Sequence, residues 1–525
     1  MLRSLRNILR LSTIARTLQR HGALEPLLPL IEGAGVAPAV LWISRVLTRP
    51  RAGLAADSRA GQRLAAALSE LGPAFIKLGQ MLSTRADLLG DEVATDLAML
   101  RDRLPPFPAA DARSLVEKEL GQPIEALFTS FDDAPVSAAS IAQVHYATTA
   151  DADGPGGGEV AVKILRPGIE RAFARDVDLL RWAAQLVHRT QPKLRRLKPV
   201  DVVETFAETV RMEMDLRLEA AAASELAANF AGDPSYRVPA IDWRRTARRV
   251  MTQQRLTGIP MGDRAALLAA GHDVDAVLGK AAAVFFNQVF RDGYFHADQH
   301  PGNMVVDGDG NIGAVDFGIM GRLDRKTRYY LADMLLGFIE RDYRRVAEVH
   351  FAAGYVPAHQ SMENFAQACR SIGEPIFGRP LNEISFARVL GQLFQIAETF
   401  DMEVQPQLLL LQKNMLMAEG VSRGLDPDLN IWTLTQPLIE RWMRDNRGPE
   451  ARLRQAAGDL LQAVERLPSV LANIEKSAAR LADGKIRLHP DSFAELASGR
   501  GSGDLLLWVL TAVVVALAVT LVLVW

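Results

Sequence analysis

The sequence predicts an α+β protein of two lobes, with a helical N-terminal extension, a mostly helical C-terminal lobe and a C-terminal transmembrane helix. Three observations lead to this prediction. Short apolar runs that are typical of strands, such as Val160–Lys163, lie in the middle of the chain. Helical periodicity dominates from Asp324 to about Asn446. The last 21 residues, Leu505–Trp525, contain no charged side chain.

The composition is that of an ordinary globular protein. Hydrophobic residues make up 49% and charged residues 23% of the 525 positions, which excludes a wholly disordered or collagen-like chain. Because 60 basic residues stand against 62 acidic ones, the net charge is −2, and we expect no nucleic-acid partner. The single cysteine, Cys369, can form no intramolecular disulfide, which favours a reduced compartment.

Composition and periodicity divide the chain into five segments. Adjacent prolines at Pro105 and Pro106 mark a boundary after a helical region. A Gly/Ser-rich linker at 499–503 precedes the last segment. The predicted segments are a helical extension (1–110), an N-terminal lobe (111–260), a helical C-terminal lobe (261–446), amphipathic helices with a linker (447–504) and a transmembrane helix (505–525).

Both ends of the chain have features typical of membrane contact. A helix over Leu505–Trp525 spans roughly 31 Å, which is the thickness of the hydrocarbon core of a bilayer. Because Lys485, Arg487 and Arg500 precede it, the positive-inside rule predicts that the bulk of the protein is cytoplasmic. Five arginines and no acidic residue occur in Met1–His21. This basic amphipathic helix is typical of a membrane-surface helix, a mitochondrial transit peptide or a solvated helix face.

The motifs of the middle of the chain indicate phosphoryl-transfer chemistry. Lys163 ends an apolar strand, Asp298 and Asn303 lie five residues apart in one loop, and Asp316 begins an Asp-Phe-Gly turn. Protein kinases use these residue types in this order. The strand lysine contacts the α/β-phosphates of ATP, the loop aspartate is catalytic, and the asparagine and the last aspartate bind Mg²⁺. We therefore predict Lys163 and Asp298 as catalytic residues, and Asn303 and Asp316 as metal ligands.

The spacing of the two predicted metal ligands supports this interpretation. Apolar runs flank the sequence Asp-Gly-Asp-Gly-Asn at 307–311, which predicts a β-hairpin. Such a hairpin returns the chain so that Asn303 and Asp316 face one another.

Other metal sites fit the same region less well. His296, Asp298 and His300 alternate, but on a loop this alternation does not make the side chains converge. An EF-hand that begins at Asp307 lacks the glycine at its sixth position and the glutamate at its twelfth.

The loop before the lysine strand lacks the glycines that normally cover the phosphates in a kinase. Ser137, Ala139 and Ala142 stand at the three glycine positions. Because each added Cβ limits how closely the backbone approaches a phosphate, we expect the phosphates to lie differently here. Without the downstream motifs this segment would be interpreted as an ordinary turn and strand. The predicted nucleotide-binding residues of the loop are Ser137, Ala138, Ala139, Ser140, Ile141, Ala142 and Val144.

Lys163 also needs an acidic partner, and a predicted helix after residue 210 offers two. We predict Glu213 as this partner and as a catalytic residue, with Glu219 as the second choice. Solvated acids are common on helices, so the pairing depends on the fold.

Together these motifs resemble the UbiB family of atypical kinase-like proteins, which are associated with ubiquinone biosynthesis and are bacterial relatives of the mitochondrial ADCK proteins. The resemblance implies a two-lobed protein-kinase-like fold. It also places Lys77 and Gln80 in the nucleotide cleft, although periodicity alone predicts that their helix face is solvent-exposed. The matching segments are Leu71–Gln80 with Ser83–Arg85, Ser140–His145, Val160–Lys163, Glu213–Asp215, His296–Asn303, Asp316–Gly318 and Leu411–Pro427.

The resemblance implies a membrane-anchored kinase or ATPase that binds Mg-ATP and supports ubiquinone biosynthesis. Its implied partners are lipophilic quinone precursors or membrane lipids, and other ubiquinone-biosynthesis proteins. Its implied location is the bacterial inner membrane, with a single C-terminal anchor. No Ala-Pro-Glu signature follows Gly318, and helical periodicity begins by about Asp324, which disfavours a protein substrate. The alternative is a nucleotide-gated pseudokinase scaffold that holds pathway enzymes or lipids.

Overall fold

The computed structural model describes most of the chain before residue 448. The predicted segments at 447–504 and 505–525 lie outside these residues, apart from Arg447. Within the part that is described, no helix is long and apolar enough to cross a membrane. The described residues are 2–23, 58–83, 90–98, 100, 105–150, 158–190, 199–376, 406–426 and 431–447, with short stretches between 392 and 402.

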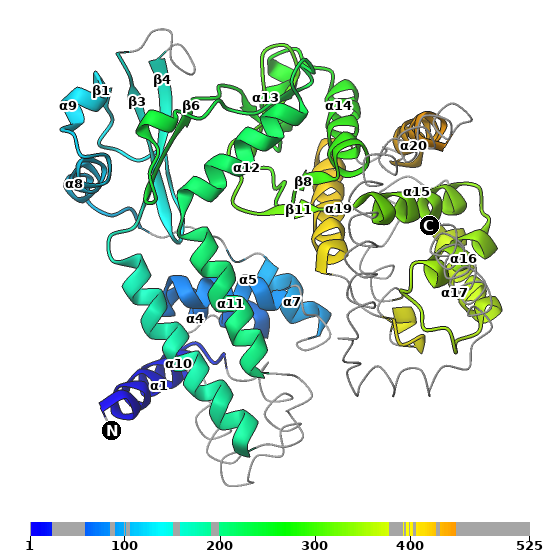
Figure 1. The fold of residues 1–525 in the computed structure, drawn as a ribbon, viewed down its shortest axis with the longest axis horizontal. Coiled ribbons are helices and arrows are strands. Elements are labelled where there is room, and N and C mark those ends of the chain that lie inside the picture. The colour runs from blue at the N-terminus through cyan, green and yellow to red at the C-terminus, as the bar shows by residue number, and fades with distance from the viewer. Residues whose placement is uncertain are drawn as a thin grey trace, which may run out of the picture. The chain divides into compact units, whose positions relative to one another are not determined.

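The described part of the chain before Pro105 consists of helices. They are α1 (Leu2–Arg20), α4 (Ala60–Leu71), α5 (Pro73–Ser83) and α7 (Asp91–Ala98). Helices α4, α5 and α7 pack against one another, and α1 lies beside α4 and the later helix α10 (Ile169–Thr190) (Figure 1).

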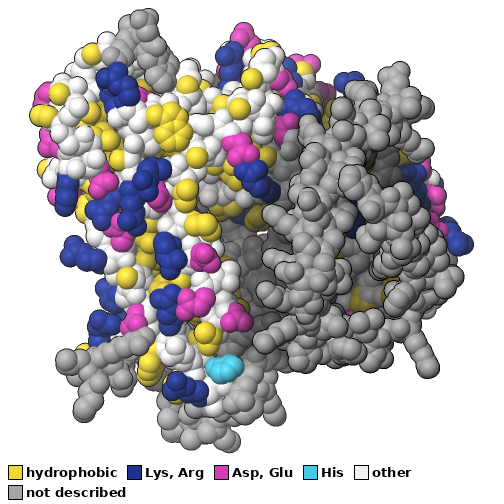
Figure 2. Space-filling model, in the orientation of Figure 1, with side chains coloured by type: hydrophobic (Ala, Val, Ile, Leu, Met, Phe, Trp, Pro, Cys, Tyr) yellow, Lys and Arg dark blue, Asp and Glu magenta, His cyan; other side chains and the backbone are white. Residues whose placement is uncertain are grey.

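The basic helix α1 is docked on the protein by ion pairs. Arg6 binds Asp178 at 2.9 Å, and Arg10 donates to both carboxylate oxygens of Asp176 at 2.9 and 3.0 Å. Arg20 pairs with Glu70 of α4. Over this part of the face shown in Figure 2, basic and acidic side chains are interspersed. Three of the arginines of α1, Arg6, Arg10 and Arg20, therefore serve contacts within the chain.

The first lobe is built on an antiparallel sheet with the order β1-β3-β4-β6. Strand β2 pairs with the N-terminal end of β3. The predicted strand that ends at Lys163 is confirmed as part of the central strand β4. Lys163 lies opposite Val144 on one side and Met251 on the other. The strands are β1 (Ser130–Phe131), β2 (Ser137–Ala138), β3 (Ala142–Thr148), β4 (Glu159–Leu165) and β6 (Val250–Gln254).

The alternation of side chains along β4 decides where Lys163 points. Val160, Val162 and Ile164 are fully buried against helices α8 (Ala109–Leu120) and α9 (Ile124–Leu127). Because successive side chains of a strand point to opposite faces, Lys163 projects from the other face. Figure 1 shows α8 and α9 on one side of the sheet and α12 on the other.

Three helices connect β4 to the rest of the first lobe and form much of its core. They are α10, α11 (Pro199–Glu213) and α12 (Leu216–Asn229). The chain turns between the last two, where the Asp215 side chain accepts a hydrogen bond from the backbone N–H of Arg217 at 3.2 Å and caps α12. Apolar side chains of all three helices join one core cluster with those of α4 and α5.

Two small sheets lie in the second lobe. One has the order β5-β10-β9-β7 and the other pairs β8 with β11. Strands β9 and β10 are antiparallel neighbours, which confirms the predicted hairpin around 307–311. The strands are β5 (Tyr236–Arg237), β7 (Ile259–Pro260), β8 (Tyr294–His296), β9 (Met304–Val306), β10 (Ile312–Ala314) and β11 (Met320–Arg322).

Helices make up most of the described chain after β11, as the periodicity predicts, and they complete an α+β fold. Helix α15 begins directly after β11, with Asp324 as its N-cap. Helix α19 lies against β11 (Figure 1). The helices of this lobe are α13 (Arg264–Ala269), α14 (Val274–Phe286), α15 (Arg325–Ile339), α16 (Tyr343–Ala352), α17 (Met362–Ile376), α19 (Pro406–Leu425) and α20 (Ile431–Arg447).

Candidate nucleotide-binding site

Lys163 lies in a cluster of charges drawn from three distant segments. Its Nζ is 2.6 Å from Oε1 of Glu219 in the first turns of α12, and 3.0 Å from Oδ2 of Asp316 after β10. The lysine side chain is only 13% exposed. The same Glu219 oxygen also accepts a hydrogen bond from the backbone N–H of Phe317 at 3.4 Å. The fold thus brings the strand lysine, a helix glutamate and the Asp-Phe-Gly turn into one site.

The predicted pairing of Lys163 with Glu213 is wrong, and the second choice, Glu219, is the partner. The sequence suggested one helix across both glutamates, but α11 ends at Glu213 and a new helix begins after the Asp215 cap. This break points the two glutamates in different directions. Glu213 instead pairs with Lys77 of α5, with 3.0 Å between Lys77 Nζ and Glu213 Oε2.

The solvent-exposed position that periodicity predicts for Lys77 is also wrong. Its side chain and that of Glu213 are each 13% exposed. This pair ties α5 to the turn that precedes α12, and α12 carries Glu219. Gln80, one turn further along α5, is half-buried. The placement of Lys77 and Gln80 in a nucleotide cleft stays a prediction.

The charge states of the cluster suit phosphate and metal binding. Burial opposes the charge of Lys163, but the carboxylates of Asp316 and Glu219 outweigh it and raise the pKa of the ammonium. Burial also disfavours the charged form of Asp316, yet Lys163 and the backbone N–H of Gly318 hold the pKa of its carboxyl below the usual range. The pKa of Glu219 is raised, first by burial. A lysine cation and the Asp316 anion therefore coexist at neutral pH.

The catalytic loop is tied to the Asp-Phe-Gly turn through a buried histidine. The backbone N–H of Asp298 donates to Nδ1 of His296 at 3.1 Å, so Nε2 carries the proton and donates to the carbonyl oxygen of Asp316. Burial lowers the pKa of His296, which favours this neutral form. His296 thus fixes the position of Asp298 relative to Asp316.

The hairpin brings the backbone of one predicted metal ligand close to that of the other. The backbone N–H of Val315 donates to the carbonyl oxygen of Asn303 at 3.1 Å, which places Asn303 beside the residue that precedes Asp316. The Nδ2 group of Asn303 donates to the carbonyl oxygen of Asp298 at 3.3 Å. That bond uses the nitrogen end of the amide, and the oxygen end is the one that a metal would use.

The alanine-rich loop is pinned to the end of β4. Nε and Nη2 of Arg166 donate to the carbonyl oxygen of Ala139 at 3.0 and 2.9 Å, and the backbone N–H of Ala139 donates to Ala142 at 2.8 Å. Ser140 is fully buried, and its Oγ has no hydrogen-bond partner among the residues described. Buried polar atoms are normally satisfied, so this hydroxyl is an exception within the loop. The role of Ser140 in nucleotide binding stays a prediction.

These side chains fit Mg-ATP. Mg²⁺ prefers oxygen ligands and is commonly held by one or two carboxylates together with phosphates, which matches the donor set of Asn303 and Asp316. The Lys163 ammonium would supply hydrogen-bond donors to phosphate oxygens. Over the described ranges, no group of three or more His, Cys, Asp or Glu side chains is arranged to hold a metal ion.

Two functional candidates were missed in the sequence. Lys413 and Asn414 of α19 contact the catalytic loop, 115 residues away in the chain. Lys413 Nζ donates to Oδ1 of Asp298 at 2.8 Å. Only the resemblance drew attention to the segment Leu411–Pro427, and its helical periodicity gave no sign of which residues face the loop.

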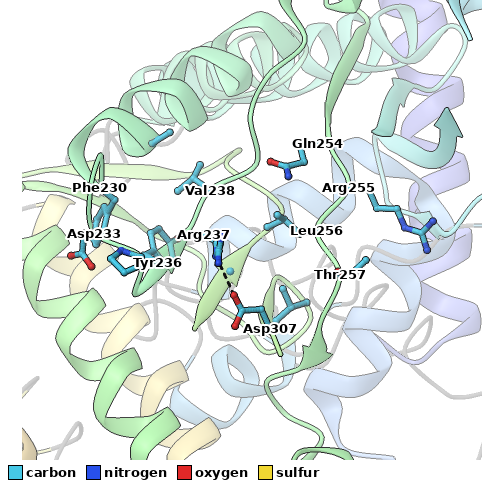
Figure 3. A pocket seen from close by; sticks show the side chains of 15 residues that line it. Phe230, Asp233, Tyr236, Arg237, Val238, Gln254, Arg255, Leu256, Thr257 and Asp307 are labelled. Atoms are coloured by element: carbon cyan, nitrogen blue, oxygen red, sulfur yellow. Dashed lines mark hydrogen bonds and ion pairs between the residues drawn. The ribbon is translucent and has the colours of Figure 1, made fainter. Parts of the chain in front are cut away.

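A separate pocket of about 700 Å³ lies on the β5-β10-β9-β7 sheet (Figure 3). The apolar side chains of Phe230, Tyr236 and Leu256 line part of this pocket. Arg237 and Asp307 also line it, and Arg237 Nε donates to Asp307 Oδ2 at 3.1 Å. None of the predicted site residues belongs to its lining. The pocket is therefore distinct from the Lys163 cluster.

The fold and the charge cluster define a kinase-like protein. The family model of the ABC1 atypical kinase-like domain matches residues 99–350, and the model of the UbiB helical domain matches residues 369–430. A probable protein kinase UbiB of Marinobacter nauticus is 46% identical over 414 residues, which cover 78% of this chain and 75% of the relative. One of Xanthomonas axonopodis pv. citri is 44% identical over 476 residues, covering 89% and 83%.

A solved structure gives the same result for the fold. The structure titled as the complex of Rv3197 and erythromycin from Mycobacterium tuberculosis is 26% identical, has a TM-score of 0.50, and covers 72% of this chain and 95% of that one. The chain belongs to the UbiB family of atypical kinase-like proteins.

Proposed function

We propose that the protein binds Mg-ATP at the Lys163 cluster and hydrolyses it in support of ubiquinone biosynthesis. The ion pairs of Lys163 with Glu219 and Asp316 carry this proposal, because they bring three motif segments of phosphoryl-transfer proteins together in one site. Lys163, held by Glu219, contacts the α/β-phosphates. Asn303 and Asp316 hold Mg²⁺, which supplies charge stabilisation for the phosphates when it is bound.

Asp298 orients the attacking water in this proposal. The water oxygen forms a bond to the γ-phosphorus, the bond from that phosphorus to the β,γ-bridging oxygen breaks, and its electron pair leaves with ADP. The water proton passes to the Asp298 carboxylate and then to the released phosphate or to solvent. His296 supports this step, because its hydrogen bond to the backbone of Asp298 fixes the loop.

The short segment after the Asp-Phe-Gly turn supports water or a small molecule as acceptor. Strand β11 begins at Met320 and pairs at once with β8, and Asp324 already caps α15. The segment between the Asp-Phe-Gly turn and α15 is therefore too short to form a surface that binds an extended peptide substrate. We propose that turnover is coupled to lipophilic quinone precursors or membrane lipids and to other ubiquinone-biosynthesis proteins. Membership of the UbiB family supports the link to ubiquinone biosynthesis.

The proposed location is the bacterial inner membrane, with residues 505–525 as a single-pass anchor and the bulk of the protein on the cytoplasmic side. The uncharged run at 505–525 and the basic residues before it support this proposal.

A pseudokinase scaffold is the second candidate, and one observation favours it. Lysines engage both the predicted metal ligand Asp316 and the predicted catalytic residue Asp298: Lys163 pairs with the first and Lys413 with the second. A site in which these pairs persisted with nucleotide bound would bind ATP without turning it over.

Phosphate release separates the two functions. The full chain is assayed with Mg-ATP, with and without vesicles of phosphatidylethanolamine and phosphatidylglycerol that contain a lipophilic phenol. We expect vesicle-stimulated release in the wild type. Asp298→Asn should lower the rate about 10²–10⁴-fold and leave Mg-ATP binding intact, because it removes only the base. Asp316→Asn should weaken Mg²⁺-dependent binding itself. Binding without release under every condition would establish the scaffold instead.

A further inference from the structure

The cation that pairs with Asp298 belongs to a helix outside the kinase motifs. Lys413 Nζ lies 2.8 Å from Asp298 Oδ1, and both side chains are partly exposed, at 35% and 26%. Lys413 belongs to α19, within the segment matched by the UbiB helical domain. The helical domain thus reaches the residue proposed to orient the acceptor.

The neighbouring residue holds α19 in register with the loop. Asn414 is fully buried. Its Nδ2 donates to the carbonyl oxygen of His296, and its Oδ1 accepts from the backbone N–H of Gln299 at 3.2 Å. These two bonds bracket Asp298 on either side. A buried amide satisfied at both ends fixes a local geometry, so the backbone at Lys413 is placed accurately beside the catalytic aspartate.

Stability alone gives a poor account of the Lys413 pair. An ion pair with this degree of exposure contributes little to folding, and ordering a long lysine side chain opposes the gain. Asn414 already anchors α19 to the loop through its backbone contacts. The ammonium is therefore better explained by what it does for a ligand that approaches Asp298.

We propose that Lys413 is a catalytic residue that binds the terminal phosphate of the nucleotide. This inference rests on the proposed function of the same site. When Mg-ATP binds, the Lys413 ammonium moves from Asp298 to an oxygen of the γ-phosphate, and the Asp298 carboxylate becomes available to the acceptor. The ammonium keeps its three protons throughout and stabilises the charge that develops on the transferred group, as other phosphotransferases do with a basic side chain.

The distances permit this exchange. An acceptor oxygen that is hydrogen-bonded to Asp298 lies about 3 Å from the carboxylate, and the phosphorus lies about 3–3.5 Å beyond it. The lysine, already 2.8 Å from the same carboxylate, reaches a phosphate oxygen in that space by rotating about its side-chain bonds. In the proposed function Lys163, which contacts Glu219 and Asp316, is already assigned to the α/β-phosphates.

The test compares ligands that do and do not carry a γ-phosphate. In the full chain, Lys413→Met should lower kcat for phosphate release about 10²–10³-fold, as loss of one transition-state donor does. It should also weaken binding of the Mg complex of β,γ-imido-ATP about tenfold and change Mg-ADP binding less than twofold. Lys413→Arg, which keeps the cation, should recover much of the discrimination between the two nucleotides.

Arg423→Gln is the matched control, because it removes a cation that pairs with Glu419 of the same helix. It should leave the ratio of the two affinities unchanged. An unchanged ratio and kcat in Lys413→Met would overturn the inference while leaving the proposed function intact. If the wild type binds nucleotide without turnover, the affinity ratio alone decides. A wild type that binds no nucleotide would overturn both proposals.

Discussion

Lys163 and Lys413 each bind a carboxylate of the candidate site, but their surroundings differ. Lys163 stands on the central strand of a sheet, is 13% exposed and has two carboxylate partners. Lys413 stands on a helix from another domain, is 35% exposed and contacts Asp298 alone among the site carboxylates. The first lysine keeps Glu219 as a partner when Asp316 turns to Mg²⁺ in the proposed function. The second has one partner to exchange, which suits a group that moves during turnover.

Replacing Lys163 should have the largest effect. Lys163→Met removes the only cation placed between Glu219 and Asp316 in the described site and leaves two carboxylates facing each other. We expect phosphate release to fall at least about 10³-fold, because both phosphate binding and the position of Asp316 are lost. Phosphate release under saturating Mg-ATP measures this effect.

Lys163→Arg provides the matching control. Arginine keeps the charge but not the compact point contact of lysine, so thermal stability should stay near that of the wild type while activity remains low. Nearly normal turnover in Lys163→Met would contradict the assignment of Lys163, and the comparison with Lys413 would then fail.

Replacing Glu219 or Glu213 should have smaller effects, and the two replacements should affect different properties. Glu219→Gln should lower turnover about 10–100-fold, because Lys163 keeps Asp316 as its remaining carboxylate partner and is less well positioned for phosphate. Glu213→Gln leaves the Lys163 contacts in place and removes the carboxylate that pairs with Lys77. We expect it to reduce the free energy of unfolding by about 3 kcal/mol, since both members of that pair are largely buried.

Urea unfolding and phosphate release on the same two variants measure these effects. A larger loss of turnover in Glu213→Gln than in Glu219→Gln would favour Glu213 as the functional partner of Lys163 and contradict the assignment of Glu219.

The difference between the two lysines also explains how far the sequence could predict the site. Lys163, Asn303 and Asp316 lie in short motifs whose local structure is a strand or a hairpin, and those elements are confirmed. The choice of Glu219 required knowing that a helix ends at Glu213. The Asp215 cap was a usable signal for that break, because aspartate is a preferred N-cap residue.

The contact of Lys413 with Asp298 could not be predicted in this way. It joins residues 115 positions apart, and it depends on how α19 packs against β11. Periodicity predicts that α19 is a helix but not which of its polar residues faces another element. The same holds for Lys77, whose partner lies on α11. Long-range ion pairs between helices follow from packing, which a local pattern does not contain.

The smallest expected effect concerns the helix that carries Lys413. Glu419 of α19 is largely buried beside Arg423, and burial raises the pKa of its carboxyl to about 7, although Arg423 acts in the opposite direction. The ordinary value is 4.5. Between these pH values the folded protein holds a proton that the unfolded chain releases, so the free energy of unfolding falls as pH rises from about 4.5 to about 7.

Glu419→Gln should remove this pH dependence, because glutamine does not ionise. Relative to the variant, the wild type should lose thermal stability between pH 5 and 8, by about 2–4 °C for each kcal/mol involved. Melting curves across this range measure the difference. The ratio of β,γ-imido-ATP to ADP affinity should not change at pH 8, because Lys413 and Asn414 keep their contacts with the catalytic loop. A changed ratio would mean that Glu419 also positions Lys413, and the second lysine would then depend on the packing of its helix as closely as the first depends on its sheet.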